Sequence, residues 1–156
     1  MSDEVIVSRR KHVAVVGSRD FPKPALVVAF CLALPRDVLI VTGDCPTGAD
    51  EAARRAIDLR QQHMHRFVFF ADWRTHGKKA GPLRNQALVD SLAPEQDELI
   101  AFACSVEAVT RDKPVNRGTR DVSDRAKKRG IPVTTIYPTA TEDAVRALAA
   151  IAGGVP

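Results

Sequence analysis

The sequence has 156 residues, of which 45% are hydrophobic and 27% are charged, and its formal net charge at pH 7 is +4. This balance excludes a disordered chain, and the length suits one domain with a sizeable core. The small excess of Lys and Arg is compatible with an anionic partner, either a nucleotide or a nucleic acid.

Secreted and membrane proteins do not fit the sequence. The three cysteines, Cys31, Cys45 and Cys104, are odd in number and far apart, which predicts neither a disulfide framework nor a metal site. The N-terminal residues carry no signal-peptide pattern. The longest apolar run, residues 25–34, is shorter than the roughly 20 residues that span a bilayer. We therefore expect a cytoplasmic protein with no membrane partner, no metal and no cofactor.

Short apolar runs alternate with helix-like segments along the chain. Strands buried on both faces, the pattern of parallel sheets, are predicted at residues 13–16, 38–41, 66–70, 98–102 and 133–136. Helices are predicted at residues 25–34, from residue 49, from residue 81, at 118–128 and after the capping residue Thr141. This order predicts an α/β fold, a Rossmann-like three-layer sandwich with a mainly parallel sheet of about five strands and helices on both faces. We expect one domain at residues 12–152, with a flexible lead at 1–11 and a flexible end at 153–156.

Three helices carry more specific expectations about packing. The helix at 25–34 is apolar on nearly every side, which indicates either a fully covered core helix or a subunit interface. In the helix from residue 81, the residues expected to face inward are Leu83, Ala87, Leu88 and Leu92. In the last helix they are Ala144, Val145, Leu148 and Ile151.

The second predicted strand leads into a loop that is bracketed by Gly43 and Gly48 and followed by a helix. Such a helix start favours anions, because its unpaired N–H groups and its dipole point the same way. The glycine spacing is that of a P-loop, but Ala49 and Asp50 stand where Lys and Ser or Thr are needed, so triphosphate hydrolysis of that kind is not expected. The candidate binding residues of this segment are Gly43, Asp44, Thr47, Gly48, Ala49 and Asp50. Asp50 either caps the helix or contacts a ribose hydroxyl.

Other polar residues also follow predicted strands or begin predicted helices. Gly17, Ser18 and Arg19 come after the first strand, where they form a turn or meet a phosphate. Asp72 and Trp73 follow the third strand, and Trp73 either covers apolar surface or stacks on a base.

Two helix starts add further candidates. Arg84 and Asn85 lie in the first turn of the third helix, where a cation opposes the dipole, which indicates an anionic neighbour. Arg117, Gly118, Thr119 and Asp121 open the fourth helix after a long basic loop. In a Rossmann strand order, the segments after strands one and four face the same crevice.

Five short motifs in one order carry a family resemblance. They are Val15-Val16-Gly17-Ser18-Arg19, Thr42-Gly43-x-x-x-x-Gly48-Ala49-Asp50, Asp72-Trp73, Gly81-Pro82-x-Arg84-Asn85 and Arg117-Gly118-Thr119-x-Asp121. Together they resemble the YspA-type, cpYpsA-related family of the SLOG superfamily, which also includes the Lonely Guy phosphoribohydrolases and the DNA-processing protein of natural transformation. The resemblance implies a Rossmann-like sheet, a pocket for a nucleotide or NAD-derived ligand, a homo-oligomer, and sensing or processing of that ligand in bacterial or phage conflict systems.

The sequence departs from the phosphoribohydrolases at their catalytic motif, Pro-Gly-Gly-x-Gly-Thr-x-x-Glu. Gly118-Thr119 remains, but Val122 occupies the position of the glutamate. Asp121 comes one residue early, which is about 100° of rotation on a helix. Arg84 resembles the arginine that those enzymes place against the substrate phosphate. Arg84 and Asp121 are therefore candidates for catalysis, and the residues support a pocket better than they support hydrolysis.

Three functions follow as hypotheses. The first is binding of a nucleotide or NAD-like phosphoribosyl ligand, and the second is a nucleoside-monophosphate N-glycosidase that uses Asp121. The third is single-stranded nucleic-acid binding, against which the single tryptophan and single tyrosine argue. The basic residues proposed for that third function are Lys78, Lys79, Arg111, Lys113 and Arg117.

Overall fold

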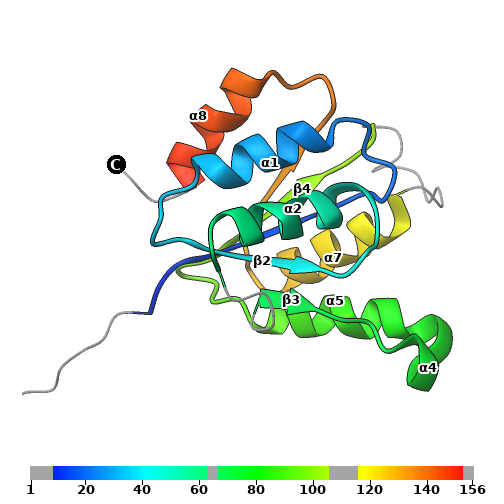
Figure 1. The fold of residues 1–156 in the computed structure, drawn as a ribbon. Helices are drawn as coiled ribbons and strands as arrows, with labels where there is room; N and C mark the ends of the chain where they lie inside the picture. The colour runs from blue at the N-terminus through cyan, green and yellow to red at the C-terminus, as the bar shows by residue number, and fades with distance from the viewer. Residues whose placement is uncertain (1–8, 63–66, 106–115, 153–156) are drawn as a thin grey trace, which may run out of the picture.

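The computed structural model describes residues 9–62, 67–105 and 116–152. It confirms the predicted class, a Rossmann-like α/β sandwich with one five-stranded, all-parallel sheet in the order β3-β2-β1-β4-β5 (Figure 1). Arg111 and Lys113 lie outside the described residues, as does the first residue of the predicted third strand, Arg66.

The strands form where the apolar runs predicted them. They are β1 (His12–Gly17), β2 (Leu39–Gly43), β3 (Val68–Phe69), β4 (Glu98–Phe102) and β5 (Val133–Ile136). β1 and β4 lie side by side at the centre, with Val15 opposite Ile100, and the chain continues outward from them in opposite directions. This is the switch point predicted from a Rossmann order, and open α/β sheets bind ligands at this position.

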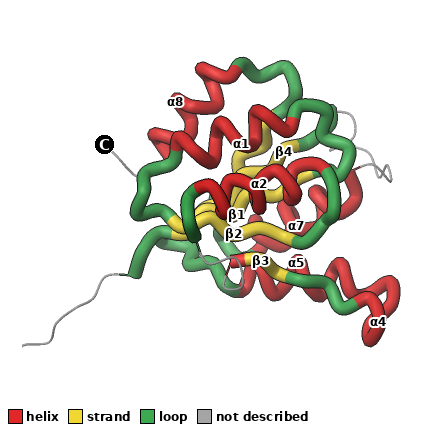
Figure 2. The backbone as a smooth tube through the Cα atoms, viewed as in Figure 1, coloured by secondary structure: helices red, strands yellow, loops and turns green. Residues whose placement is uncertain are grey.

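Helices cover both faces of the sheet (Figure 2). They are α1 (Pro24–Ala33), α2 (Gly48–Leu59), α4 (Trp73–His76), α5 (Ala80–Asp90), α7 (Arg117–Lys128) and α8 (Glu142–Ala152), and a short 3₁₀ helix, η1 (Gly77–Lys79), precedes α5. Successive side chains of a strand point to opposite faces. Val13 and Val15 accordingly pack under α1, α2 and α8, whereas Ala14 and Val16 pack against α5 and α7.

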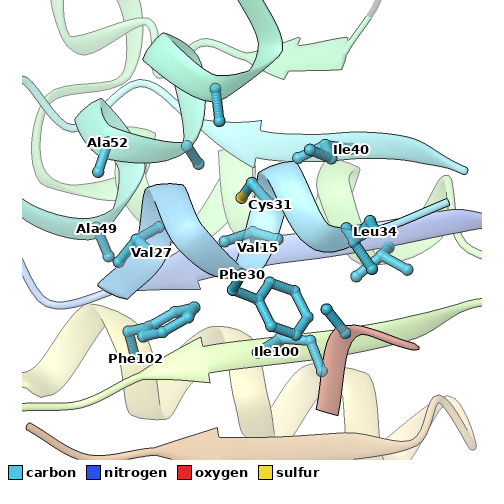
Figure 3. Close-up of a cluster of buried hydrophobic side chains, with 14 of the residues drawn as sticks. Val15, Val27, Phe30, Cys31, Leu34, Ile40, Ala49, Ala52, Ile100 and Phe102 are labelled. Atoms are coloured by element: carbon cyan, nitrogen blue, oxygen red, sulfur yellow. The ribbon is translucent and has the colours of Figure 1, made fainter. Parts of the chain in front are cut away.

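The apolar helix α1 is covered within the chain on more than one side. It packs against α2 and α8 as well as the sheet (Figure 1). Phe30 is fully buried and meets Phe102 of β4 edge to face, with the ring centroids 5.9 Å apart (Figure 3). Its composition therefore agrees with the core-helix interpretation, and the homo-oligomer stays a prediction.

Several local expectations were wrong, and each has a packing reason. The predicted third strand is reduced to β3, because Val68 and Phe69 pair with β2 at the edge of the sheet and Phe70 is exposed. The segment after the third strand, for which no helix was predicted, contains α4, because the Asp72 carboxylate accepts a hydrogen bond from the Thr75 N–H and caps a short helix.

The inward faces of two helices agree with the prediction only in part. In and just after α5, Leu88 and Leu92 are buried as predicted, but Leu83 and Ala87 are exposed, and Asn85 and Val89 are buried in their place. In α8, Val145 is buried and Leu148 packs against the core as predicted, but Ala144 and Ile151 are exposed, and Ala149 and Ala152 are buried in their place. The buried face of α8 packs against α1, and that of α5 packs against α7 and β2.

The N-terminal end of the sheet is held by ion pairs. Arg9 and Lys11, from the segment expected as a lead, pair with Asp97 and Glu98 at 2.8 Å each. Within residues 9–62, 67–105 and 116–152, no helix is long and apolar enough to cross a membrane.

Candidate functional site

A cavity of about 430 Å³ lies at the carboxyl ends of β1 and β2, between the first turns of α5 and α7. Most of the residues predicted as ligand contacts line it, although they come from widely separated parts of the chain. These are Gly17, Ser18, Arg19, Gly43, Asp44, Asp50, Trp73, Arg84, Asn85, Arg117, Gly118, Thr119 and Asp121. The structure therefore brings together the segments after strands one and four, as the predicted switch point required.

Four predicted contacts do not line the cavity: Thr47, Gly48, Ala49 and Asp72. The Ala49 N–H donates to the carbonyl of Ser18 at 3.1 Å, and the Thr47 hydroxyl donates to the carbonyl of Arg19 at 3.1 Å. The start of α2 is thus fastened to the turn after β1. The Ala49 N–H is therefore not available to a phosphate, because it already has an acceptor.

An ion pair forms one wall of the cavity. Arg84 Nη1 lies 2.5 Å from Asp44 Oδ1, and the second oxygen of Asp44 accepts a hydrogen bond from the Ala71 N–H at 2.9 Å. Arg84 Nε donates to Asn85 Oδ1 at 2.9 Å. The Arg84 guanidinium is therefore held in position by a carboxylate 40 residues away in the sequence.

Asp50 lies behind this pair and is only 5% exposed. Its Oδ2 accepts a hydrogen bond from the Cys45 N–H at 3.3 Å. Burial raises the pKa of the Asp50 carboxyl to about 6, although the nearby Arg84 charge opposes this rise. Gly43 makes room for the arrangement, because a Cβ there would come within 2.6 Å of the Asp50 carboxylate and 2.7 Å of Arg84. A titratable carboxyl thus lies in the cavity wall.

A second polar contact joins α5 to α7. Asp121 Oδ2 accepts hydrogen bonds from Asn85 Nδ2 and from Arg125 Nε, both at 2.9 Å. Asn85 also lies 3.4 Å from the carbonyl of Gly118. The buried Asn85 side chain therefore fixes Asp121 and the start of α7 at the cavity.

Sequence reasoning missed some of the lining residues. The apolar ones are Val16, Pro46, Pro82, Leu88 and Val122, Gly81 adds backbone, and Cys45 and Lys78 add a thiol and a cation. Cys45 and Pro46 lie inside the glycine-bracketed loop, and this position in the sequence could have identified them as candidates for the cavity lining. Lys78 had been assigned only to nucleic-acid binding.

The fold and cavity define the protein as a Rossmann-like α/β domain with a ligand-sized, charged pocket at the carboxyl ends of its parallel strands. The chain is 36% identical over 107 residues to the Gene 61 protein of Mycobacterium phage D29, an alignment that covers 64% of this chain and 71% of the phage protein. The chain belongs to the family of that phage protein. No family model matches the sequence, and no solved structure matches the chain.

Proposed function

We propose that the cavity binds a nucleotide or a nucleotide-derived, NAD-like phosphoribosyl ligand, which the protein senses or processes, and that the chain is a YspA-type member of the SLOG superfamily. One observation carries this proposal. Four cationic side chains, Arg19, Lys78, Arg84 and Arg117, line one cavity together with the carboxyls of Asp44, Asp50 and Asp121. Guanidinium groups suit phosphate oxygens and carboxylates suit ribose hydroxyls, so both halves of a phosphoribosyl group find partners.

The size and place of the cavity support the same class of ligand. A volume of about 430 Å³ falls within the range of roughly 300–1,000 Å³ that small-molecule sites occupy. The first turn of α7, a helix of 12 residues, opens on the cavity through Gly118 and Thr119. Its dipole favours an anion at that end.

Thermal unfolding in the presence of AMP, IMP, NAD and cyclic ADP-ribose tests the proposal. We expect at least one of these ligands to raise Tm, because a ligand that binds only the folded state stabilises it. Arg19→Gln should lower the affinity for that ligand about tenfold, because it removes a charge-assisted contact. The variant should still fold, because the Arg19 side chain is exposed.

Arg146→Gln is the matched control for this experiment. Arg146 is also exposed, but it pairs with Glu142 on α8, whose residues do not line the cavity. Its removal should leave the affinity unchanged. If none of the four ligands raises Tm, or if both variants bind as the wild type does, the proposed function is wrong.

An N-glycosidase is the second candidate, and the pair of carboxyls in the cavity favours it. Asp50 is buried and has a raised pKa, while Asp121 is hydrogen-bonded to Arg125. In many glycosidases, two carboxyl groups in different environments act as the acid and the nucleophile. Release of free base from AMP, IMP or NAD, lost in Asp121→Ala, would establish the activity. No release, or equal rates in both proteins, would exclude it.

Nucleic-acid binding has less support among the described residues. Lys78 and Arg117 line the cavity, but Arg111 and Lys113 lie outside the residues that the structure describes. A steep loss of single-stranded DNA affinity with added salt would favour this function over small-ligand binding.

A further inference from the structure

Trp73 is exposed although it is the largest apolar side chain at the cavity. It is the single tryptophan of the sequence, it lines the cavity, and 56% of its surface is exposed. A tryptophan whose role is to cover apolar surface is normally buried by the chain that it covers. More than half of this side chain is left accessible beside a site that the proposed function fills with a ligand.

The indole ring is also held against a rigid element. The Asp72 cap fixes the start of α4, and the six-membered ring of Trp73 lies against Gly81 of α5. A Cβ at Gly81 would come within 3.3 Å of Trp73 Cη2, so glycine lets the ring approach the helix backbone closely. Pro82 and Leu88 of the same helix continue the apolar lining of the cavity. The ring thus has a defined place in an apolar wall.

Arg19 and Arg117 reach the site from other elements than Trp73, whereas Lys78 follows α4 directly in η1 and Arg84 lies on α5. Trp73 follows β3, at one edge of the sheet, and Arg117 begins the helix that follows β4, three strands further along. Three inter-strand spacings of ~4.8 Å separate these two ends by about 14 Å. Trp73, Arg19 and Arg117 nevertheless line one cavity, so their side chains extend from these ends toward a shared space.

We propose that Trp73 is a stacking platform for the planar base of the ligand, with the phosphate at the opposite end of the cavity near Arg19 and Arg117. This inference rests on the proposed function and adds to it the orientation of the ligand and the requirement for an aromatic base. Stacking on an indole face is tolerant of base identity, so the platform selects for a base without selecting which one.

Two probes separate the base from the phosphate: AMP, and ribose 5-phosphate, which lacks the base. Because the chain has a single tryptophan, its emission reports this site alone. With the intact protein, AMP should quench the emission and bind about tenfold more tightly than ribose 5-phosphate, which should bind without quenching. Affinities would be measured by calorimetry, so that they do not depend on the fluorophore.

Variants complete the test. Trp73→Ala should lower AMP affinity about tenfold, to the level of ribose 5-phosphate, and leave ribose 5-phosphate unchanged, while Trp73→Phe should recover most of the loss. Phe70→Ala is the control, because Phe70 is an exposed aromatic nearby that does not line the cavity, and it should bind both probes as the wild type does.

The outcomes distinguish this inference from the proposed function. If both probes bind but Trp73→Ala leaves the affinity for AMP unchanged, or lowers the affinity for both probes equally, Trp73 is not a stacking platform. The proposed phosphoribosyl site is then retained. If neither probe binds the wild-type protein, the proposed function fails for monophosphates, and the platform fails with it.

Discussion

Gly48→Ala is expected to lower the free energy of unfolding by about 4 kcal/mol. Gly48 has a φ of +75°, and a Cβ there would lie 2.2 Å from the carbonyl oxygen of Ser18 and 2.6 Å from the backbone of Arg19. The methyl group would strain its own backbone and push the start of α2 away from the turn after β1. The hydrogen bond from Ala49 to Ser18 would then lengthen or break. Urea unfolding followed by circular dichroism measures the loss.

Gly77→Ala separates the two causes of that loss. Gly77 also has a positive φ, +54°, but among the described residues no atom lies within 4 Å of a Cβ built there. This control should therefore show the backbone strain alone, about 2 kcal/mol, because φ +54° with ψ −133° is a conformation that alanine rarely adopts. If Gly48→Ala costs no more than Gly77→Ala, the close packing between the two loops is not what requires glycine at position 48.

The requirement at Gly48 also changes what the glycine-bracketed loop means. Its spacing resembles a phosphate-binding loop, but the structure uses the second glycine to bring α2 against the turn that carries Ser18 and Arg19. The second half of the loop therefore supports the cavity wall and does not itself line the cavity. Gly43, Asp44, Cys45 and Pro46 at its beginning are the part that faces the cavity.

The fold followed from the sequence because buried parallel strands and their helices are local patterns. The composition of Val13–Val16 and of Glu98–Phe102 alone predicted strands, and the helix predicted from residue 49 forms as α2, whose alanine face, including Ala52 and Ala56, is fully buried. The place of the cavity followed as well, because the carboxyl ends of parallel strands share one edge.

The pairings inside the cavity could not be predicted, because they join residues that are distant in the sequence. Nothing in the local pattern at Asp44 indicates that Arg84 is its partner, or that the amide of Ala71 is the second one. The difference between the predicted and the observed inward face of α5 has the same origin. Asn85 turns inward because Asp121 and Gly118 of α7 provide its hydrogen-bond partners.

Asp50 shows how a local rule can miss a role. At the start of a helix a carboxylate is normally read as a cap or as a dipole contact. Here the side chain is buried behind Gly43 and accepts from Cys45 in the preceding loop. Its raised pKa depends on burial, which no pattern in the sequence could reveal.

Asp50→Asn is therefore expected to stabilise the protein at neutral and alkaline pH, against the usual direction for a substitution at a buried polar residue. The pKa of Asp50 is raised from 3.8 to about 6, so the folded state binds a proton that the unfolded state has released between these values. Wild-type stability consequently falls as pH rises through this window, by about 3 kcal/mol in total. Asparagine is uncharged and keeps an oxygen that accepts from the Cys45 N–H, so the stability of the variant should not fall with pH in this window.

Urea unfolding of both proteins across the window measures the effect. The two free energies of unfolding should be similar below pH 3.8, and Asp50→Asn should become the more stable protein as the pH passes 6, by about 3 kcal/mol. Glu51→Gln, the adjacent residue on the more exposed side of α2, is the matched control and should follow the wild type. If the difference in free energy of unfolding between Asp50→Asn and the wild type stays constant with pH, burial does not shift the pKa of the Asp50 carboxyl. If Asp50→Asn is instead less stable than the wild type above pH 6, the charge of the wild-type Asp50 carboxylate, held by Arg84, stabilises the fold.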